Sequence, residues 1–192
     1  MRIIGIDPGS IITGIGIIEF NNSGLNLLSY NSIILNRKEV FFKRLKIIYN
    51  ECLKKIKKYK PDQMAIETVF YGKNIQSMMK LGQARGVAIL SALNSNLNIY
   101  EYSPREIKKS VTGYGGATKY QVQFMVKKIL NIKENPVFFD SSDALATALC
   151  HYNTISENPK NFILSKNVKG KALNWTDYVK NHPEKILLNR NI

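Results

Sequence analysis

Residues 1–20, MRIIGIDPGSIITGIGIIEF, are the stretch that decides the fold. RIIGID at residues 2–7 is apolar through its middle, which is typical of a strand buried on both faces and therefore central in its sheet. Pro8-Gly9 predicts a turn, and TGIGIIEF at residues 13–20 predicts a second strand. The first acidic residue of the chain, Asp7, is thus expected at the C-terminal end of a central strand.

Working outward, the chain alternates strand and helix patterns, which predicts an α/β fold. A third strand is expected at about 25–35, after a hairpin turn at 22–24. We expect one mixed sheet, with three antiparallel strands followed by parallel strands, and helices on both faces. The further elements are strands at 64–67 and 97–102, and helices at 41–59, at 74–94, from the capping box at 103–106, from the capping box at 118–121 to about 130, and from about 140 to 152.

The chain is strongly basic, with 28 Lys+Arg against 14 Asp+Glu and a formal net charge of +14. This balance favours a nucleic-acid partner over an anionic membrane. Residues 36–60 alone contain ten Lys or Arg and two Glu, so we expect this helix face to contact phosphates. The 192 residues are enough for one domain with a real core.

The chain lacks the sequence features of membrane and secreted proteins. No apolar run approaches the ~20 residues of a membrane span, and Asp7-Pro8-Gly9 makes the apolar N-terminus a poor signal peptide. Cys52 and Cys150 are too few for a disulfide framework or a zinc site. We therefore expect a soluble, cytoplasmic protein with two reduced thiols.

Four acidic residues stand out because each closes or follows an apolar run, where an uncompensated carboxylate is costly. They are Asp7, Glu67, and the pair Asp140 and Asp143 at a helix start. Carboxylates that converge at strand ends repel one another unless divalent cations lie between them. Mg²⁺ suits such ligands and takes phosphate oxygens as well. Two ions ~4 Å apart would stabilise both the attacking water and the leaving oxygen of a phosphodiester displacement.

Each acidic motif also has an ordinary structural interpretation. Asp7-Pro8-Gly9 is a common turn, Asp140 and Asp143 are an N-cap with a dipole-favoured acid, and Glu67 is a strand-end charge that reaches solvent. The catalytic interpretation gains its strength from the occurrence of all three motifs at the expected elements of one fold. The sequence therefore predicts a metal-dependent nuclease.

Longer motifs carry a family resemblance that covers roughly residues 1–153 in unbroken order. GIDPGS, AIETVFYGKNIQSMMKLGQARGVAIL, EYSPREIKKSVTGYGGATKYQVQFMV and DSSDALATALCH closely resemble the RuvC family of bacterial Holliday-junction resolvases. The resemblance implies a ribonuclease-H-like fold and a homodimeric, Mg²⁺-dependent endonuclease. Such an enzyme nicks two opposing strands of a four-way DNA junction symmetrically, in recombination and repair. The family's acidic tetrad corresponds to Asp7, Glu67, Asp140 and Asp143.

The resemblance also assigns DNA-binding positions. The aromatic residue proposed to stack on an unpaired junction base corresponds to Phe70, and Lys73 lies in the same strand-to-helix loop. The two functional lysines correspond to Lys108 and Lys119, while Lys109 is an alternative to Lys108. Lys119 opens a helix, so it can reach a phosphate beside backbone N–H groups. It is also expected to take part in catalysis.

The helix at 74–94 is the expected dimer surface, because an isologous dimer would present two equivalent sites to a symmetric junction. Its candidate interface residues follow helical spacing, and its two glycines permit close helix approach. They are Met78, Leu81, Gly82, Arg85, Gly86 and Ile89. The alternative is that this face packs on its own sheet. The resemblance further implies Mg²⁺, two ions per subunit with Mn²⁺ as a substitute, and the RuvA–RuvB branch-migration complex as a partner.

We expect a catalytic domain over 1–157 and a basic, partly ordered extension over 158–192, in which Trp175 indicates a short anchored helix. Three other functions compete with this prediction. An actin-like or Hsp70-like ATPase shares the GID-x-G motif, but needs a duplicated half for which 192 residues leave no room. The others are a non-catalytic DNA-junction binder and a ribonuclease-H-like nuclease on another branched substrate.

Overall fold

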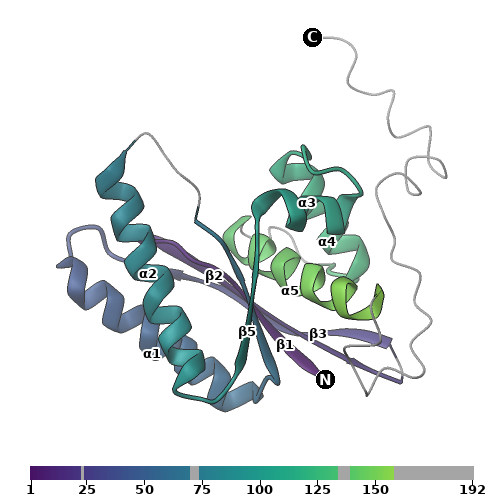
Figure 1. Ribbon diagram of the computed structural model, residues 1–192, viewed down its shortest axis with the longest axis horizontal. Helices are drawn as coiled ribbons and strands as arrows, with labels where there is room; N and C mark the ends of the chain where they lie inside the picture. The colour runs from purple at the N-terminus through teal and green to yellow at the C-terminus, as the bar shows by residue number, and fades with distance from the viewer. Residues whose placement is uncertain (23, 70–73, 134–138, 158–192) are drawn as a thin grey trace, which may run out of the picture.

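A computed structural model describes residues 1–22, 24–69, 74–133 and 139–157. It shows a five-stranded sheet in the order β3-β2-β1-β4-β5, with helices on both faces (Figure 1). The strands are β1 (Arg2–Asp7), β2 (Ile12–Asn21), β3 (Gly24–Ile34), β4 (Gln63–Glu67) and β5 (Asn98–Tyr102). The helices are α1 (Phe41–Tyr59), α2 (Ile75–Leu93), α3 (Pro104–Thr112), α4 (Lys119–Ile129) and α5 (Phe139–Glu157).

The first strand is central, as its apolar pattern predicts. β1 pairs antiparallel with β2 and parallel with β4, and β4 pairs parallel with β5. Ile3 packs in the core on one face of the sheet, while Ile4 and Ile6 pack in the core on the other, all without solvent exposure. The mixed sheet expected from the sequence is therefore confirmed, with its antiparallel strands first.

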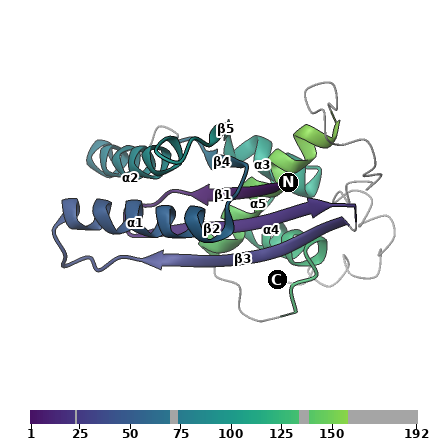
Figure 2. The same cartoon turned by 90° about the horizontal axis from the view of Figure 1, so that it is seen from below.

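The helices form two layers. α1 and α2 lie side by side over one face and bury Ile48, Cys52, Ala84 and Ala88 against it (Figure 2). α3, α4 and α5 cover the other face. None of the helices in the described ranges is long and apolar enough to cross a membrane.

Glycines in the first two strands let α5 lie directly on the sheet. A Cβ atom on Gly5 would lie 2.1 Å from the carbonyl oxygen of Ala144, and one on Gly14 would lie 1.9 Å from that of Asp140. Gly14 is the register partner of Asp7 across the β1–β2 ladder. This close approach brings the N-terminal turn of α5 to the end of β1, where Asp7 lies.

A buried histidine ties α5 to the parallel strands. The Nε2 of His151 lies 2.7 Å from Oε1 of Gln63 on β4, and its Nδ1 lies 2.6 Å from the Tyr102 hydroxyl on β5. Burial lowers the pKa of His151 to about 4, so the ring is neutral and can accept from the tyrosine while donating to the glutamine. The elements that carry the acidic residues are thus cross-linked inside the core.

Most helix ends lie where the sequence predicts them. Both expected capping boxes are present, at Ser103–Glu106 and at Thr118–Gln121. α5 continues to Glu157, beyond the end expected near residue 152. The hydroxyls of Thr154 and Ser156 donate to carbonyls one turn earlier, so these polar residues continue the helix. The expected helix around Trp175 and the extension over 158–192 lie outside the described residues.

Candidate active site

Two of the predicted acids end neighbouring strands. β1 and β4 run parallel, with Ile6 opposite Ile66, so Asp7 and Glu67 follow at the same edge of the sheet. Asp143 reaches the same place from α5, and the three carboxylates line one pocket of about 220 Å³. The pocket is also lined by Pro104, Ile107, Lys108, Lys119 and Val122.

The carboxylates of this pocket are electrostatically strained. Burial, with the charges of Glu67, Asp143 and Asp140, raises the pKa of Asp7 well above its usual range. Burial and the charge of Asp143 raise the pKa of Glu67 to about 7. Burial also raises the pKa of Asp143, although Lys119 opposes the shift. The site therefore favours added positive charge, which would let all these groups ionise together.

One lysine supplies part of that charge. The Nζ of Lys119 lies 3.4 Å from Oδ2 of Asp143, and this carboxylate raises the pKa of the lysine. The capping box at Thr118 and Gln121 fixes Lys119 as the first residue of α4. Its side chain remains largely exposed, at 66%, so it can also reach a bound phosphate.

Asp140 lies in the first turn of α5, next to the same site. It does not line the pocket, but its charge raises the pKa of Asp7 and of Asp143. The acidic residues that the sequence singled out thus act on one another electrostatically.

The donor set fits a hard divalent cation. All the ligands on offer are carboxylate oxygens, which Mg²⁺ and Mn²⁺ prefer. Among the described residues, no group of three or more Asp, Glu, His or Cys side chains is close enough together to hold a metal ion by itself. At phosphate sites, Mg²⁺ usually takes one or two carboxylates and completes its coordination with water and substrate oxygens.

The predicted DNA-binding residues fall into separate places. Lys108 lines the carboxylate pocket with Lys119, whereas the adjacent Lys109 lines a different pocket. Phe70 and Lys73 lie outside the described residues. The sequence alone did not distinguish Lys108 from Lys109, because only the rotation of α3 about its axis separates them.

The basic face of α1 extends away from the site. Arg44, near its start, donates from Nη1 to the carbonyl of Ser10, just after the Asp7 turn, at 2.8 Å. Its last residue, Tyr59, accepts from Nη1 of Arg2 at the opposite end of β1. The lysines of the last two turns of α1 are therefore remote from the carboxylates, and phosphate contact along this face stays a prediction.

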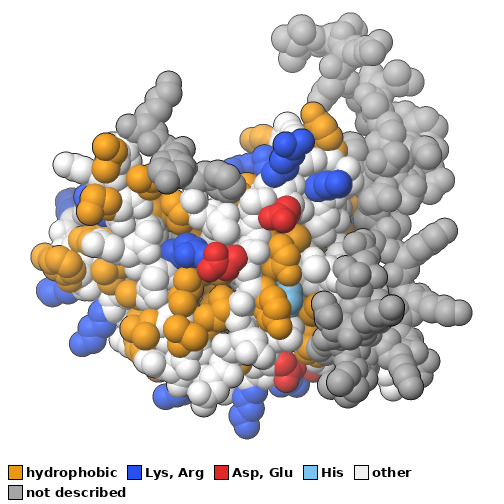
Figure 3. Space-filling view, in the orientation of Figure 1, with side chains coloured by type: hydrophobic (Ala, Val, Ile, Leu, Met, Phe, Trp, Pro, Cys, Tyr) orange, Lys and Arg blue, Asp and Glu red, His pale blue; other side chains and the backbone are white. Residues whose placement is uncertain are grey.

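The candidate dimer residues of α2 divide into two groups. Gly82 and Gly86 are exposed, with nothing within 4 Å of an added Cβ. Exposed apolar side chains extend this face at Ile75, Met79, Leu90 and Leu93, and Figure 3 shows hydrophobic side chains over α2.

The other group makes contacts within its own chain. Arg85 donates from Nε to the carbonyl of Glu67 at 3.2 Å, and its Nη2 lies 2.7 Å from Glu101. Ile89 packs against the core, and Met78 and Leu81 are half-buried. Arg85 therefore helps to hold the end of β4, a role that its helical spacing did not indicate.

Sequence comparison identifies close relatives along nearly the whole chain. A family model described as "Crossover junction endodeoxyribonuclease RuvC" matches residues 3–151. A protein of that name from Chloroherpeton thalassium is 46% identical over 188 residues, which cover 97% of this chain and all of the relative. One from Ruminiclostridium cellulolyticum is 46% identical over 154 residues, covering 80% of this chain and 93% of the relative.

Solved structures agree with the sequence matches. Thermus thermophilus RuvC superposes with a TM-score of 0.74 at 29% identity, covering 82% of this chain and 96% of that one. The same protein in complex with a Holliday junction substrate gives a TM-score of 0.76 over the same shares. The ribonuclease-H-like fold class expected from the sequence is confirmed by these neighbours.

Proposed function

We propose that this chain, which belongs to the RuvC family of crossover junction endodeoxyribonucleases, resolves Holliday junctions by nicking two opposing strands. The observation that carries the proposal is the convergence of Asp7, Glu67 and Asp143 on one pocket, beside Lys108 and Lys119. An acidic pocket in a chain with a net charge of +14 combines a cation site with a surface that attracts DNA.

We infer that the cofactor is Mg²⁺, two ions per subunit, with Mn²⁺ as a substitute. When bound, the ions would supply an activated water and charge stabilisation at the scissile phosphate. Asp7, Glu67, Asp140 and Asp143 would hold them. The apolar wall of Pro104, Ile107 and Val122 limits solvent near these charges.

The lysines take a separate part in the reaction. Lys119 places its ammonium group 3.4 Å from Asp143, where it can contact a phosphate oxygen whose negative charge grows in the transition state. Lys108, from α3, adds a second cation to the lining of the same pocket. These two side chains would orient the DNA strand against the carboxylates.

Paired nicking further implies a homodimer, because two equivalent sites about a two-fold axis match the two equivalent strands of a junction. The exposed face of α2 supports this assembly. By family resemblance, we also propose that the enzyme works with the RuvA–RuvB branch-migration complex, in the cytoplasm where the chromosome lies.

The proposal is tested with a labelled synthetic four-way junction and a linear duplex of the same sequence. We expect paired nicks in the junction with Mg²⁺ or Mn²⁺, none with chelator, and an intact duplex. Asp7→Asn should lower the cleavage rate by ~10³-fold or more, because it removes a charged metal ligand. Its junction affinity, measured in chelator, should stay near that of the wild type.

Three results would contradict the proposal or its metal site. Junction binding without cutting by the wild-type chain in Mg²⁺ would favour a non-catalytic junction binder. Equal cutting of junctions and of other branched or linear DNA would favour a ribonuclease-H-like nuclease with a different substrate. Normal cutting by Asp7→Asn would show that the metal site lies elsewhere.

A further inference from the structure

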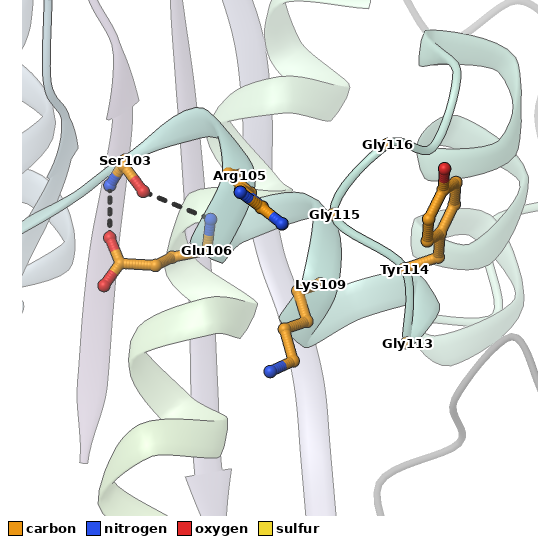
Figure 4. Close-up of a pocket in the computed structure, with 8 residues that line it drawn as sticks. All are labelled: Ser103, Arg105, Glu106, Lys109, Gly113, Tyr114, Gly115 and Gly116. Carbon is orange, nitrogen blue, oxygen red and sulfur yellow. Dashed lines mark hydrogen bonds between the residues drawn. The ribbon is translucent and has the colours of Figure 1, made fainter.

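A second pocket shares α3 with the carboxylate pocket (Figure 4). Its volume is about 570 Å³, within the ~300–1,000 Å³ typical of ligand sites. Lys108 lines the carboxylate pocket, whereas Arg105 and Lys109 line this one. The complete lining is Ser103, Arg105, Glu106, Lys109, Gly113, Tyr114, Gly115 and Gly116.

Two cations of this pocket are available for a ligand. Arg105 and Lys109 are exposed, and neither forms an ion pair within the described part of the chain. The one acid in the lining, Glu106, accepts the backbone N–H of Ser103 at 2.8 Å as part of the capping box. Figure 4 shows its carboxylate turned toward Ser103, away from Tyr114. The pocket therefore presents net positive charge.

The opposite wall is a glycine turn that holds an aromatic ring at the surface. A Cβ on Gly115 would lie 2.7 Å from Cγ of Arg105, and one on Gly116 would lie 2.7 Å from the ring of Tyr114. Both side chains thus lie directly on the glycine backbone (Figure 4). The backbone N–H of Tyr114 also donates to the Thr112 hydroxyl at 3.2 Å. The Tyr114 ring is held in place while 64% of the residue remains exposed.

A guanidinium group, an ammonium group and an exposed aromatic ring are the groups that bind one nucleotide of a DNA strand. Arginine and lysine make charge-assisted bonds to phosphate oxygens, and aromatic rings stack on nucleosides with little sequence preference. Lysine and arginine side chains gather over α3 (Figure 3), so the second pocket continues the basic surface that begins at Lys108.

We propose that this pocket binds a backbone phosphate of the junction outside the scissile position. Arg105 and Lys109 contact the phosphate oxygens, and the ring of Tyr114 lies against the adjoining nucleoside. The inference rests on the proposed function, because it assumes that the strand held at Lys108 and Lys119 continues across α3. The pocket anchors the DNA and takes no part in bond breaking.

The test compares junction affinity in chelator, over a range of salt, with single-turnover cleavage at saturating protein in Mg²⁺. For Arg105→Ala/Lys109→Ala, affinity at 0.15 M salt should fall roughly five- to thirty-fold. The slope of log affinity against log salt should become shallower by about 1–2, as expected for one or two lost phosphate contacts. The saturated cleavage rate should stay within about twofold of wild type, since this pocket contains no carboxylate of the tetrad.

Two further variants separate local contacts from net charge. Lys54→Ala/Lys57→Ala removes the same charge from the end of α1 remote from the site, and should weaken binding clearly less than Arg105→Ala/Lys109→Ala does. Gly116→Ala removes no charge but displaces the Tyr114 ring. It should weaken binding at least about fivefold without changing the salt slope, as should Tyr114→Ala.

Unchanged affinity and slope in Arg105→Ala/Lys109→Ala would overturn the inference, as would an equal loss in the α1 control. A slower saturated rate with normal affinity would also overturn it. Two checks guard against misfolding: Arg105→Gln/Lys109→Gln, which removes the charges but keeps polar side chains, and circular dichroism of each variant. A wild-type chain that binds junctions without cutting them would contradict the proposed function instead, and the affinity series would still test the pocket.

Discussion

Glu67 lowers the stability of the metal-free fold at neutral pH and above, while it provides a carboxylate to the proposed metal site. Its pKa is raised to about 7 by burial and by Asp143, so the metal-free fold favours the protonated acid. The stability contributed by that protonation is present below the unfolded-state pKa near 4.5 and is lost as pH rises through about 7. In chelator, Glu67→Gln should therefore be more stable than wild type at pH 8, by on the order of 1–3 kcal/mol, and similar to it at pH 4.5.

Urea unfolding at the two pH values measures this difference. The matched control is Glu51→Gln on α1, a half-buried carboxylate that lies 3.8 Å from the ammonium of Lys54 and should show no such gain at pH 8. Added Mg²⁺ should stabilise wild type more than Glu67→Gln, because the variant lacks a charged ligand. A glutamine variant that is less stable than wild type at pH 8 in chelator would contradict the electrostatic account.

At the scale of elements, the contact between β1 and α5 sets the geometry of the site. A Cβ on Gly5 would lie 2.1 Å from the carbonyl oxygen of Ala144 and 2.7 Å from the backbone nitrogen of Ala148. Gly5→Ala should therefore push α5 outward and destabilise the protein by about 1–3 kcal/mol. Because α5 carries Asp140 and Asp143, cleavage by the folded variant should also fall, by at least about tenfold.

The control for this prediction is Ile3→Val in the same strand. It removes one buried methylene and should destabilise the protein by about 0.5–1.5 kcal/mol while leaving α5 in place. Unfolding curves and single-turnover cleavage, both at low temperature, measure the two effects. If Gly5→Ala lost stability and kept wild-type cleavage, the position of α5 would not control the site.

Some features of the helices and strands were predictable from the sequence, and others were not. Capping boxes and apolar spacing are local signals, so the starts of α3 and α4 and the central place of β1 were predictable. The role of Gly5 and Gly14 was not, since a glycine in a strand indicates close approach only once the covering helix is known. Lys108 and Lys109 were indistinguishable for the same reason, because helix rotation is set by packing. The acidic positions were predictable because carboxylates after apolar runs need a compensating partner.

At the scale of the whole molecule, we propose that the exposed face of α2 forms the dimer interface. Gly82 and Gly86 have open space around an added Cβ, and apolar side chains such as Ile75 and Met79 are exposed beside them. A second copy of the helix can approach closely there. Gly82→Leu or Gly86→Leu should convert a solution dimer to a monomer, and paired cuts to independent single nicks.

Analytical ultracentrifugation measures the oligomeric state, and a supercoiled plasmid with an extruded cruciform separates paired from single cuts. Paired nicks linearise such a plasmid, whereas independent nicks first give open circles. Lys54→Leu adds the same side chain to exposed α1 and should alter neither result. A folded monomer that still linearises the plasmid in one encounter would contradict this assembly.

The separation of the acidic residues along the chain has a consequence for biosynthesis. Asp7 belongs to the first strand and Asp143 to the last described helix, and α5 covers the sheet face beside β1 and β2. Contacts between such distant segments form late in folding, because long loops must close first. A nascent chain that has not yet released α5 from the ribosome therefore lacks both a complete core and a complete set of acids. With Asp143 as a proposed metal ligand, we expect nuclease activity only after synthesis has passed residue 143, and N-terminal fragments that end before it should not cut DNA.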